Sequence, residues 1–463
     1  MIHRDASAWV RLADGRLLRF SILLGIVLSL GVTAGMTAHA ITVGSVEGGW
    51  VYPYRQWADL TIVAVCLIYS AGAAATLMIP WKVAEHRPWW TLVSWIVVAT
   101  ALQWILRTMA PYPLEAQFAS DNANSFQSVA EAYDAVDLLK RHGRVRLNAP
   151  LHVQSNMPGK LLLTEGLQKA TARADVLPWL VIGISNLGAL LMFGFVRALL
   201  DSRRVALYAA LLYLFLPART FFMPLMNTVT PLVVITCAWL LLNWLRTGRT
   251  LYAAVLGFTL YLLAFFEPLP LVMGLLFLAL AVAAIGRRQI SWERFVAQAA
   301  VTIGVFIATA EAMTAWTGFD IVRTFQTIGR HAMEFNATTA RPYAVWITAN
   351  LWEFALGVGL CQLVASVGVL LALLSAPGRW RDRLSAPMAA TCMGLFAVLG
   401  AVDLVGVNRG EVTRLWIFLG CFYQIPLAWA CSLRDSQVAI AAVVAVSAFH
   451  AAVGTALVGF VVP

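Results

Sequence analysis

The chain has 463 residues, of which 60% are hydrophobic and only 12% are charged, and its mean hydropathy is +0.77. These values exclude a water-soluble globular protein of this size. The formal net charge of +10 comes largely from arginines scattered at the ends of apolar segments. Because they form no basic stripe with interleaved aromatic side chains, the sequence indicates no nucleic-acid partner, and membrane lipids are the expected surroundings.

Apolar windows of about 20 residues recur along the chain, and each is long enough to cross a hydrocarbon core of roughly 30 Å. Helices are expected, because the alternation typical of a barrel is absent and backbone groups in lipid must be paired within the protein. The predicted fold is all-α, a polytopic transmembrane helix bundle. Its 13 expected spans are 17–43, 58–80, 89–109, 176–199, 203–218, 229–246, 250–266, 269–286, 294–317, 345–375, 387–407, 413–431 and 437–460.

Two long polar segments, 110–175 and 318–344, lie between these spans. If the N-terminus is cytoplasmic, the inner connections contain eighteen Lys and Arg residues. The short outer connections contain five, namely Arg55, Arg107, Arg219, Arg409 and Arg414. The positive-inside rule therefore puts both polar segments on the extracytoplasmic side. Together with arginine-rich, lysine-poor usage, this predicts an integral protein of a bacterial inner (plasma) membrane, with an extracytoplasmic active face.

The first polar segment has an organisation of its own. Residues 124–143 follow the pattern of an amphipathic helix in the membrane interface, which His142-Gly143 is expected to end. The apolar residues at helical spacing are Phe126, Val129, Ala130, Tyr133 and Val136. The extended stretch "RVRLNAPLHV", a Met-Pro-Gly turn at 157–159 and a second short amphipathic helix from Lys160 are expected to follow.

The cysteines are expected to be small buried hydrophobic residues, because all six fall within apolar spans. They are Cys66, Cys237, Cys361, Cys392, Cys421 and Cys431. The sequence indicates neither a disulfide framework nor a metal site.

Polar residues that are unusual for such a chain occur at the predicted outer ends of spans and in the outer loops. They are Asp121, His152, Asn156, Lys160, Arg219, Asn227, Glu267, Arg409, Glu411 and Arg414. Since they share one side of the membrane, they are expected to converge on one outward-facing cavity. An anionic head group with an apolar anchor would suit that cavity.

Three of these residues have structural as well as functional interpretations. Asp121 suits a helix cap, or a general base for a hydroxyl acceptor. His152 suits an ordinary loop histidine or a catalytic one. Lys160 follows a Pro-Gly turn, so it either extends to lipid headgroups or contacts a phosphate.

Glu267 and the residues around Gly410 are harder to explain by structure alone. An unpaired carboxylate close to hydrocarbon is costly, so Glu267 is expected to have a cationic partner or to bind a substrate hydroxyl. Arg409, Glu411 and Arg414 come at the start of a span. They suit an interfacial anchor with a local ion pair, or a phosphate clamp, since planar guanidinium groups match phosphoryl oxygens.

Three features of layout carry a family resemblance. An apolar span ends at Arg107, the acidic Asp121 precedes an interfacial helix, and the stretch "PLHVQSNMPGKLLL" follows before the next span. In this layout the chain resembles the GT-C superfamily of multi-spanning glycosyltransferases, and "RGEVTRLWIFL" and "RPYAVWITANLWEF" resemble segments of bacterial members. The resemblance covers most of the chain from Trp81 onward. It implies two N-terminal transmembrane helices in 1–80 and a catalytic core in 81–463, which includes the outer loop 110–175.

The resemblance implies an inverting hexosyl- or pentosyltransferase, which moves a sugar from a polyprenyl-phosphate donor to an extracytoplasmic glycan or lipid acceptor. For the base the resemblance points to Asp121, and for the lipid phosphate to Lys160, Arg409 and Arg414. With the residues singled out above, the candidate catalytic residues are Asp121, His152 and Glu267, with either Asp121 or Glu267 as the base. Substrate or phosphate binding would fall to Asn156, Lys160, Arg219, Asn227, Arg409, Glu411 and Arg414. A divalent metal ion is compatible with this chemistry, although no clear motif supports one.

Two other classes remain open. A lipid-linked sugar flippase or transporter would need polar or broken helices near the bilayer midplane, whereas the charges of this chain keep to one face. An O-antigen polymerase- or ligase-like glycan transferase would favour a large outer loop late in the chain, whereas the largest loop here comes early.

Overall fold

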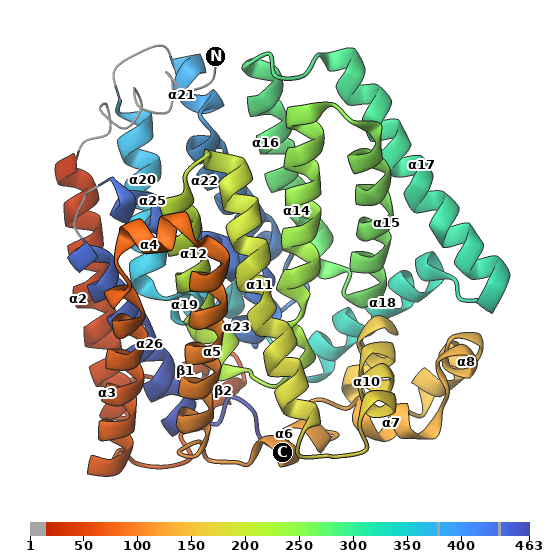
Figure 1. The fold of residues 1–463 in the computed structure, drawn as a ribbon. Helices are drawn as coiled ribbons and strands as arrows, with labels where there is room; N and C mark the ends of the chain where they lie inside the picture. Colours follow the sequence, from red (N-terminus) through yellow and green to blue (C-terminus); the bar gives the residue numbers. More distant parts are fainter. Residues whose placement is uncertain (1–14, 377–379, 434–436) are drawn as a thin grey trace.

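The structure, a computed structural model, describes residues 15–376, 380–433 and 437–463 (Figure 1). Within these ranges the fold is a bundle of α-helices. The one sheet is a short antiparallel hairpin of β1 (Val43–Ser45) and β2 (Trp50–Tyr52). The predicted class, an all-α bundle of apolar helices, is confirmed.

Ten helical segments in the described ranges are long and apolar enough to cross a membrane. They are α2 (Gly15–Thr37), α3 with η1 (Leu60–Ala75 and Thr76–Met78), α5 (Pro88–Arg107), α11 (Leu177–Leu200), α12 with α13 (Arg203–Leu214 and Pro217–Phe221), η2 with α14 (Met226–Thr228 and Thr230–Thr247), η3 with α16 (Leu269–Met273 and Gly274–Gly286), α17 (Trp292–Thr317), α22 (Pro387–Val405) and α26 (Gln437–Leu457). Each corresponds to one of the 13 expected spans.

The other three expected spans take different forms. The span 250–266 is α15 (Thr250–Phe266), an apolar helix of only 17 residues. The span 345–375 is a pair, α19 (Tyr343–Val358) and α20 (Leu360–Leu374), bent by 102°. The span 413–431 is a series of short helices: α23 (Val412–Leu415), α24 (Ile417–Gly420), η4 (Cys421–Tyr423) and α25 (Gln424–Ser432).

Gly359 explains the bend between α19 and α20. Its φ angle of 98° lies in a region that residues with a Cβ rarely adopt, and an added Cβ would approach the Gln362 side-chain oxygen to 2.3 Å. A hydropathy window detects apolarity and length, but not a single residue that ends the ladder of helical hydrogen bonds.

Eight shorter or peripheral helices complete the bundle. They are α4 (Trp81–His86), α6 (Leu114–Ala119), α7 (Gln127–Ala132), α8 (Ala135–Leu147), α9 (Leu151–Gln154), α10 (Gly159–Ala170), α18 (Ile321–Thr338) and α21 (Trp380–Ser385). The helix α18 lies within 318–344, which the sequence pattern predicts to be a polar outer segment. Asp320 caps α18 by accepting a hydrogen bond from the Arg323 backbone, and Ile321 and Ile328 on one face are buried.

The structure corrects the expected form of segment 124–143. It contains two helices, α7 and α8, rather than one, and α8 runs through Gly143 to Leu147. Since α9 begins at Leu151, most of the stretch 144–153, which was expected to be extended, is helical. The break lies at Asp134, where the carboxylate of Glu165 on α10 accepts from the Ala135 N–H at 3.3 Å. The helix passes His142 because that ring is buried and packs edge-on against Phe319, at a centroid distance of 5.4 Å.

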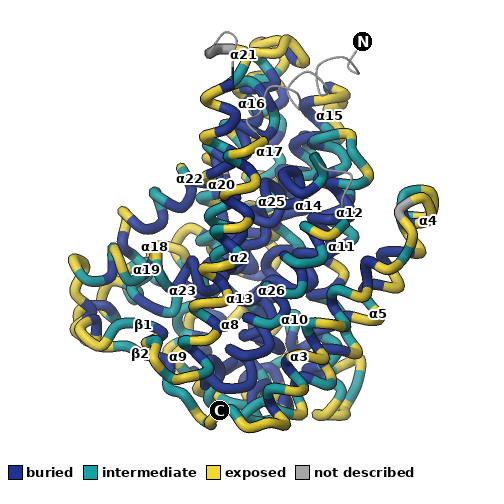
Figure 2. Tube along the Cα trace, turned by 90° about the vertical axis from the view of Figure 1, so that its left-hand side faces the viewer, coloured by how far each residue is buried: buried dark blue, intermediate teal, exposed yellow. Residues whose placement is uncertain are grey.

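The bundle packs around the span of α12 and α13, whose most apolar 18 residues are 94% buried, whereas those of α17 are only 11% buried. Figure 2 shows buried residues gathered in the interior of the bundle and exposed residues along its edges. The N-terminal helices belong to this packing, since α2 lies against α20 and α26, and α3 lies against α26 and α5. All six cysteines are buried and free, as expected. The connections α11–α12, α14–α15 and α16–α17 lie toward one end of the bundle, and helices α6 to α10 lie at the other (Figure 1).

Candidate functional site

The loop between α22 and α23 forms one wall of a polar cluster. An added Cβ at Gly410, whose φ angle is 82°, would lie 2.9 Å from the ring of Trp346 on α19. The next residue, Glu411, also has a positive φ angle, 59°, although it is not glycine. Residues with a Cβ adopt this conformation rarely, and mostly where surrounding contacts fix it.

The Glu411 carboxylate lies between two arginines. Its Oε1 is 3.3 Å from Nη2 of Arg341, and its Oε2 is 2.6 Å from Nη2 of Arg414. The side chains of Arg341 and Arg414 are 5% and 12% exposed. Burial opposes ionisation of Glu411, but the two guanidinium groups outweigh it and hold the pKa of this carboxyl below its ordinary value.

Arg341 is fixed from several sides. Its guanidinium stacks on the rings of Trp50 and Phe335, each at 5.0 Å. Its Nη1 donates to the carbonyl of Arg409 at 2.7 Å, and Nη1 of Arg409 donates back to the carbonyl of Arg341 at 2.9 Å. The Arg409 guanidinium therefore binds backbone and lies over Tyr343 at 5.5 Å, rather than facing Glu411 with the other two arginines.

His152 joins the first polar segment to this cluster. Its Nε2 is 3.0 Å from the carbonyl oxygen of Asn122 and 3.4 Å from Nη1 of Arg414. The shorter contact favours a proton on Nε2, donated to Asn122, because a lone pair there would face the carbonyl oxygen. Burial, with a smaller effect from Arg414, lowers the pKa of His152 to about 4, so the ring is neutral at pH 7.

Lys160 and Glu267 form a buried ion pair beside the histidine. Their Nζ and Oε2 atoms are 2.9 Å apart, and the side chains are 1% and 7% exposed. Asn227 donates to Oε1 of Glu267 at 3.3 Å, and the Thr230 hydroxyl donates to Oε2. Glu267 thus has the cationic partner that its position required. Burial lowers the pKa of Lys160, although Glu267 opposes that shift.

Two contacts set the position of Lys160. An added Cβ at Gly159 would lie 2.6 Å from the Cα of Phe266, so glycine lets the start of α10 approach the end of α15. The Lys160 ammonium also donates to the Asn156 side chain at 3.1 Å, and the Asn156 amide donates to the carbonyl of His152 at 2.8 Å. Through α9, the lysine pair and the arginine pair belong to one cluster.

Asp121 lies at the edge of this cluster. Its side chain is exposed, and Oδ1 accepts a hydrogen bond from the Ser128 hydroxyl at 2.7 Å. The capping interpretation of Asp121 is not borne out, because the Ser120 hydroxyl accepts from the N–H groups of Asn122 and Ala123. Since the Asn122 carbonyl contacts His152, this turn covers the histidine.

Arg219 lies apart from the cluster, inside the bundle. Its Nη1 donates to Ser185 at 3.0 Å and to Asn186 at 2.7 Å, and its guanidinium lies over the ring of Tyr213 at 4.7 Å. The Asn186 amide in turn donates to Thr100 of α5 at 2.8 Å. Most of the candidate residues therefore lie in one cluster, whereas Arg219 does not.

Two residues of the cluster, Arg341 and Glu353, were not among those predicted from the sequence. Glu353 on α19 is fully buried, and its Oε2 accepts from the Val412 N–H at 2.9 Å. Its Oε1 is buried without a hydrogen-bond partner, as are the Nε atoms of Arg341 and Arg414. A glutamate within the apolar segment 345–375 was a usable signal for a buried site.

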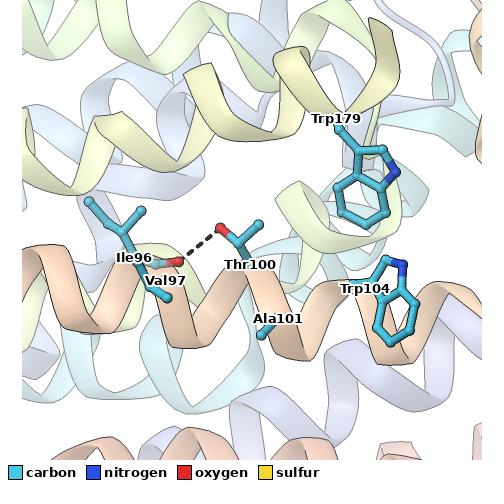
Figure 3. Close-up of a pocket in the computed structure, with 6 residues that line it drawn as sticks. All are labelled: Ile96, Val97, Thr100, Ala101, Trp104 and Trp179. Carbon is cyan, nitrogen blue, oxygen red and sulfur yellow. Dashed lines mark hydrogen bonds between the residues drawn. The ribbon is translucent and has the colours of Figure 1, made fainter. Parts of the chain in front are cut away.

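An apolar groove lies on the outer surface between α5 and α11 (Figure 3). It has a volume of about 430 Å³, and Ile96, Val97, Thr100, Ala101, Trp104 and Trp179 line it. Figure 3 shows Trp104 and Trp179 at the same end of the groove, on the two facing helices. These tryptophans are close to the helix ends that lead into and out of segment 110–175.

In the described part of the chain, no group of three or more His, Cys, Asp or Glu side chains is arranged to hold a metal ion. A scan against protein-family models gave no match to this chain, and a search of curated proteins gave none either.

Proposed function

We propose that the protein is a GT-C-type glycosyltransferase, which moves a sugar from a polyprenyl-phosphate donor to an extracytoplasmic glycan or lipid acceptor. The observation that carries this proposal is the buried cationic cluster of Arg341, Arg414 and Lys160 at one end of an apolar bundle, beside amphipathic helices. A ligand with an anionic head and an apolar tail matches both parts of this surface.

The cationic cluster suits the leaving phosphate of such a reaction. As the bond from the anomeric carbon to the phosphate oxygen breaks, negative charge develops on the phosphate, and fixed guanidinium groups stabilise it best where water is excluded. Arg341 and Arg414 offer this charge from largely buried positions. The acceptor hydroxyl attacks the opposite face of the anomeric carbon, so the configuration inverts.

Asp121 is the better candidate for the base. Glu267 is engaged by Lys160, Asn227 and Thr230, so few of its acceptor positions are free for an acceptor hydroxyl. Asp121 is exposed on a turn that contacts His152, where an acceptor hydroxyl can reach it. We assign to Asp121 the removal of the acceptor's proton, and to the groove between α5 and α11 the first isoprene units of the donor.

The test is sugar transfer from a radiolabelled polyprenyl-phosphate sugar by the purified chain in lipid nanodiscs. Asp121→Asn should lower kcat by about 100-fold or more, with KM for the donor little changed, because a base contributes mainly to the transition state. The matched control is Asp137→Asn, since Asp137 is exposed on the same polar segment. Activity of Asp121→Asn within a few-fold of wild type would remove Asp121 from this role.

One observation keeps a transporter of lipid-linked sugars as a second candidate. The polar network of Arg219, Asn186 and Thr100 lies inside the bundle, where a polar head group crossing the membrane would need partners. A transporter would move a fluorescent lipid-linked sugar between leaflets of a liposome without transferring the sugar. In that case Asp121→Asn would have no effect on the measured rate.

A further inference from the structure

Glu411 occupies the position of an anionic ligand between two arginines. Its two carboxylate oxygens lie 3.3 Å from Arg341 and 2.6 Å from Arg414, in the arrangement that a phosphate oxygen adopts with such a pair. Glu411 is anionic there, since the two arginines lower the pKa of its carboxyl. The chain thus supplies its own anion to the phosphate-binding groups of the proposed function.

Glu411 does not use all of the hydrogen-bonding capacity of these arginines. A guanidinium carries five N–H donors, and the Nε atoms of Arg341 and Arg414 are both buried without a partner. Oε1 of Glu353, which also lies in this cluster, is buried and unpartnered as well. Buried polar atoms are nearly always hydrogen-bonded, so three such atoms in one cluster indicate a ligand larger than one carboxylate.

The backbone conformation at Glu411 is also one that does not favour glutamate. Its φ angle of 59° is one that glycine adopts readily and glutamate rarely. Arg341, by contrast, is held by Trp50, Phe335 and the carbonyl of Arg409.

We propose that Glu411 is a built-in competitor of the donor's phosphate, which binds Arg341 and Arg414 by displacing the Glu411 carboxylate. This inference rests on the proposed function and adds a regulatory feature to its site. The internal anion keeps two buried arginines paired, and it limits binding to ligands whose phosphate and apolar tail together outcompete it. Free phosphate, which lacks a tail, competes poorly.

The experiment measures the Kd of a polyprenyl phosphate for the purified full chain in detergent, by microscale thermophoresis. Glu411→Gln removes the charge with little change of shape, and Glu411→Gly suits the φ angle of 59°, so it should fold even if the glutamine variant does not. Both variants should lower Kd by about 10-fold or more. The matched control is Glu334→Gln, an exposed glutamate on α18, which should leave Kd unchanged.

The opposite sign would overturn the inference. If Glu411 only holds the arginines in place for the donor, its removal raises Kd or leaves it unchanged. Tighter binding of inorganic phosphate without tighter binding of the polyprenyl phosphate would also overturn it, because the lipid-linked anion would not be the competing ligand. Failure of both wild type and variants to bind the polyprenyl phosphate would instead refute the proposed function.

Discussion

The buried pair of Lys160 and Glu267 gives a quantitative test of how the site is held together. The charged groups are 2.9 Å apart with side chains 1% and 7% exposed, so removal of either leaves an uncompensated buried charge. Such a loss costs about 3–5 kcal/mol of the free energy of unfolding. Lys160→Met and Glu267→Gln should each approach this loss. The double variant should recover most of this lost free energy, because both new side chains are neutral and close in size to the ones they replace.

Reversible unfolding in mixed micelles, followed by the fluorescence of the 18 tryptophans, measures these free energies. The matched control is Lys140→Met on α8, since Lys140 is exposed and no ion pair of its side chain is found among the described residues. Its free energy of unfolding should stay close to that of wild type. If Lys160→Met and Lys140→Met lost the same free energy of unfolding, or if the double variant were as unstable as the sum of the singles, the buried pair would not have the strength argued here.

Two further predictions concern pH and the groove. His152 has a pKa near 6.5 in the unfolded chain and about 4 in the folded chain. Protonation between these values favours the unfolded chain, so the free energy of unfolding is highest above pH 6.5 and falls as the pH drops toward 4. Between pH 6.5 and pH 4 the free energy of unfolding of wild type should fall by about 1–2 kcal/mol more than that of His152→Gln in the same assay. Parallel pH curves for the two proteins would contradict this. Ala101→Trp should fill the groove and raise KM for the polyprenyl donor about 10-fold. Ala308→Trp, on the exposed face of α17, should not, and equal effects would count against the groove as the tail site.

The hydropathy pattern predicted the bundle because a helix must be long and apolar to cross a membrane. Ten expected spans match helices, but the same windows could not show that 345–375 bends at Gly359 or that 413–431 divides into short helices. Those breaks depend on single backbone conformations and on tertiary hydrogen bonds. Likewise, the break between α7 and α8 depends on a carboxylate from Glu165, thirty residues later in the chain.

The candidate site could be predicted where a charged residue lies close to apolar spans. Glu267 needed a partner close to hydrocarbon, and the Pro-Gly turn before Lys160 indicated a side chain with a fixed direction. No pattern around Arg341, which lies in a polar segment, indicated that Trp50 from a distant hairpin would bury it. It also could not separate Arg219 from the other outer residues, because depth within the bundle is set by the packing of α11 and α12 around it.

The helix α19, which lies within the single span predicted for 345–375, holds the loop of the site in place. Asn350 on α19 donates to the Asn408 carbonyl at 3.0 Å and accepts from the Gly410 N–H at 3.1 Å. Glu353, one turn later, accepts from Val412 at 2.9 Å, so α19 holds the loop on both sides of Glu411. These bonds are what an unfavourable backbone conformation needs in order to persist. An asparagine and a glutamate in an apolar segment are costly in lipid, and the bend after α19 lets them bind a loop instead.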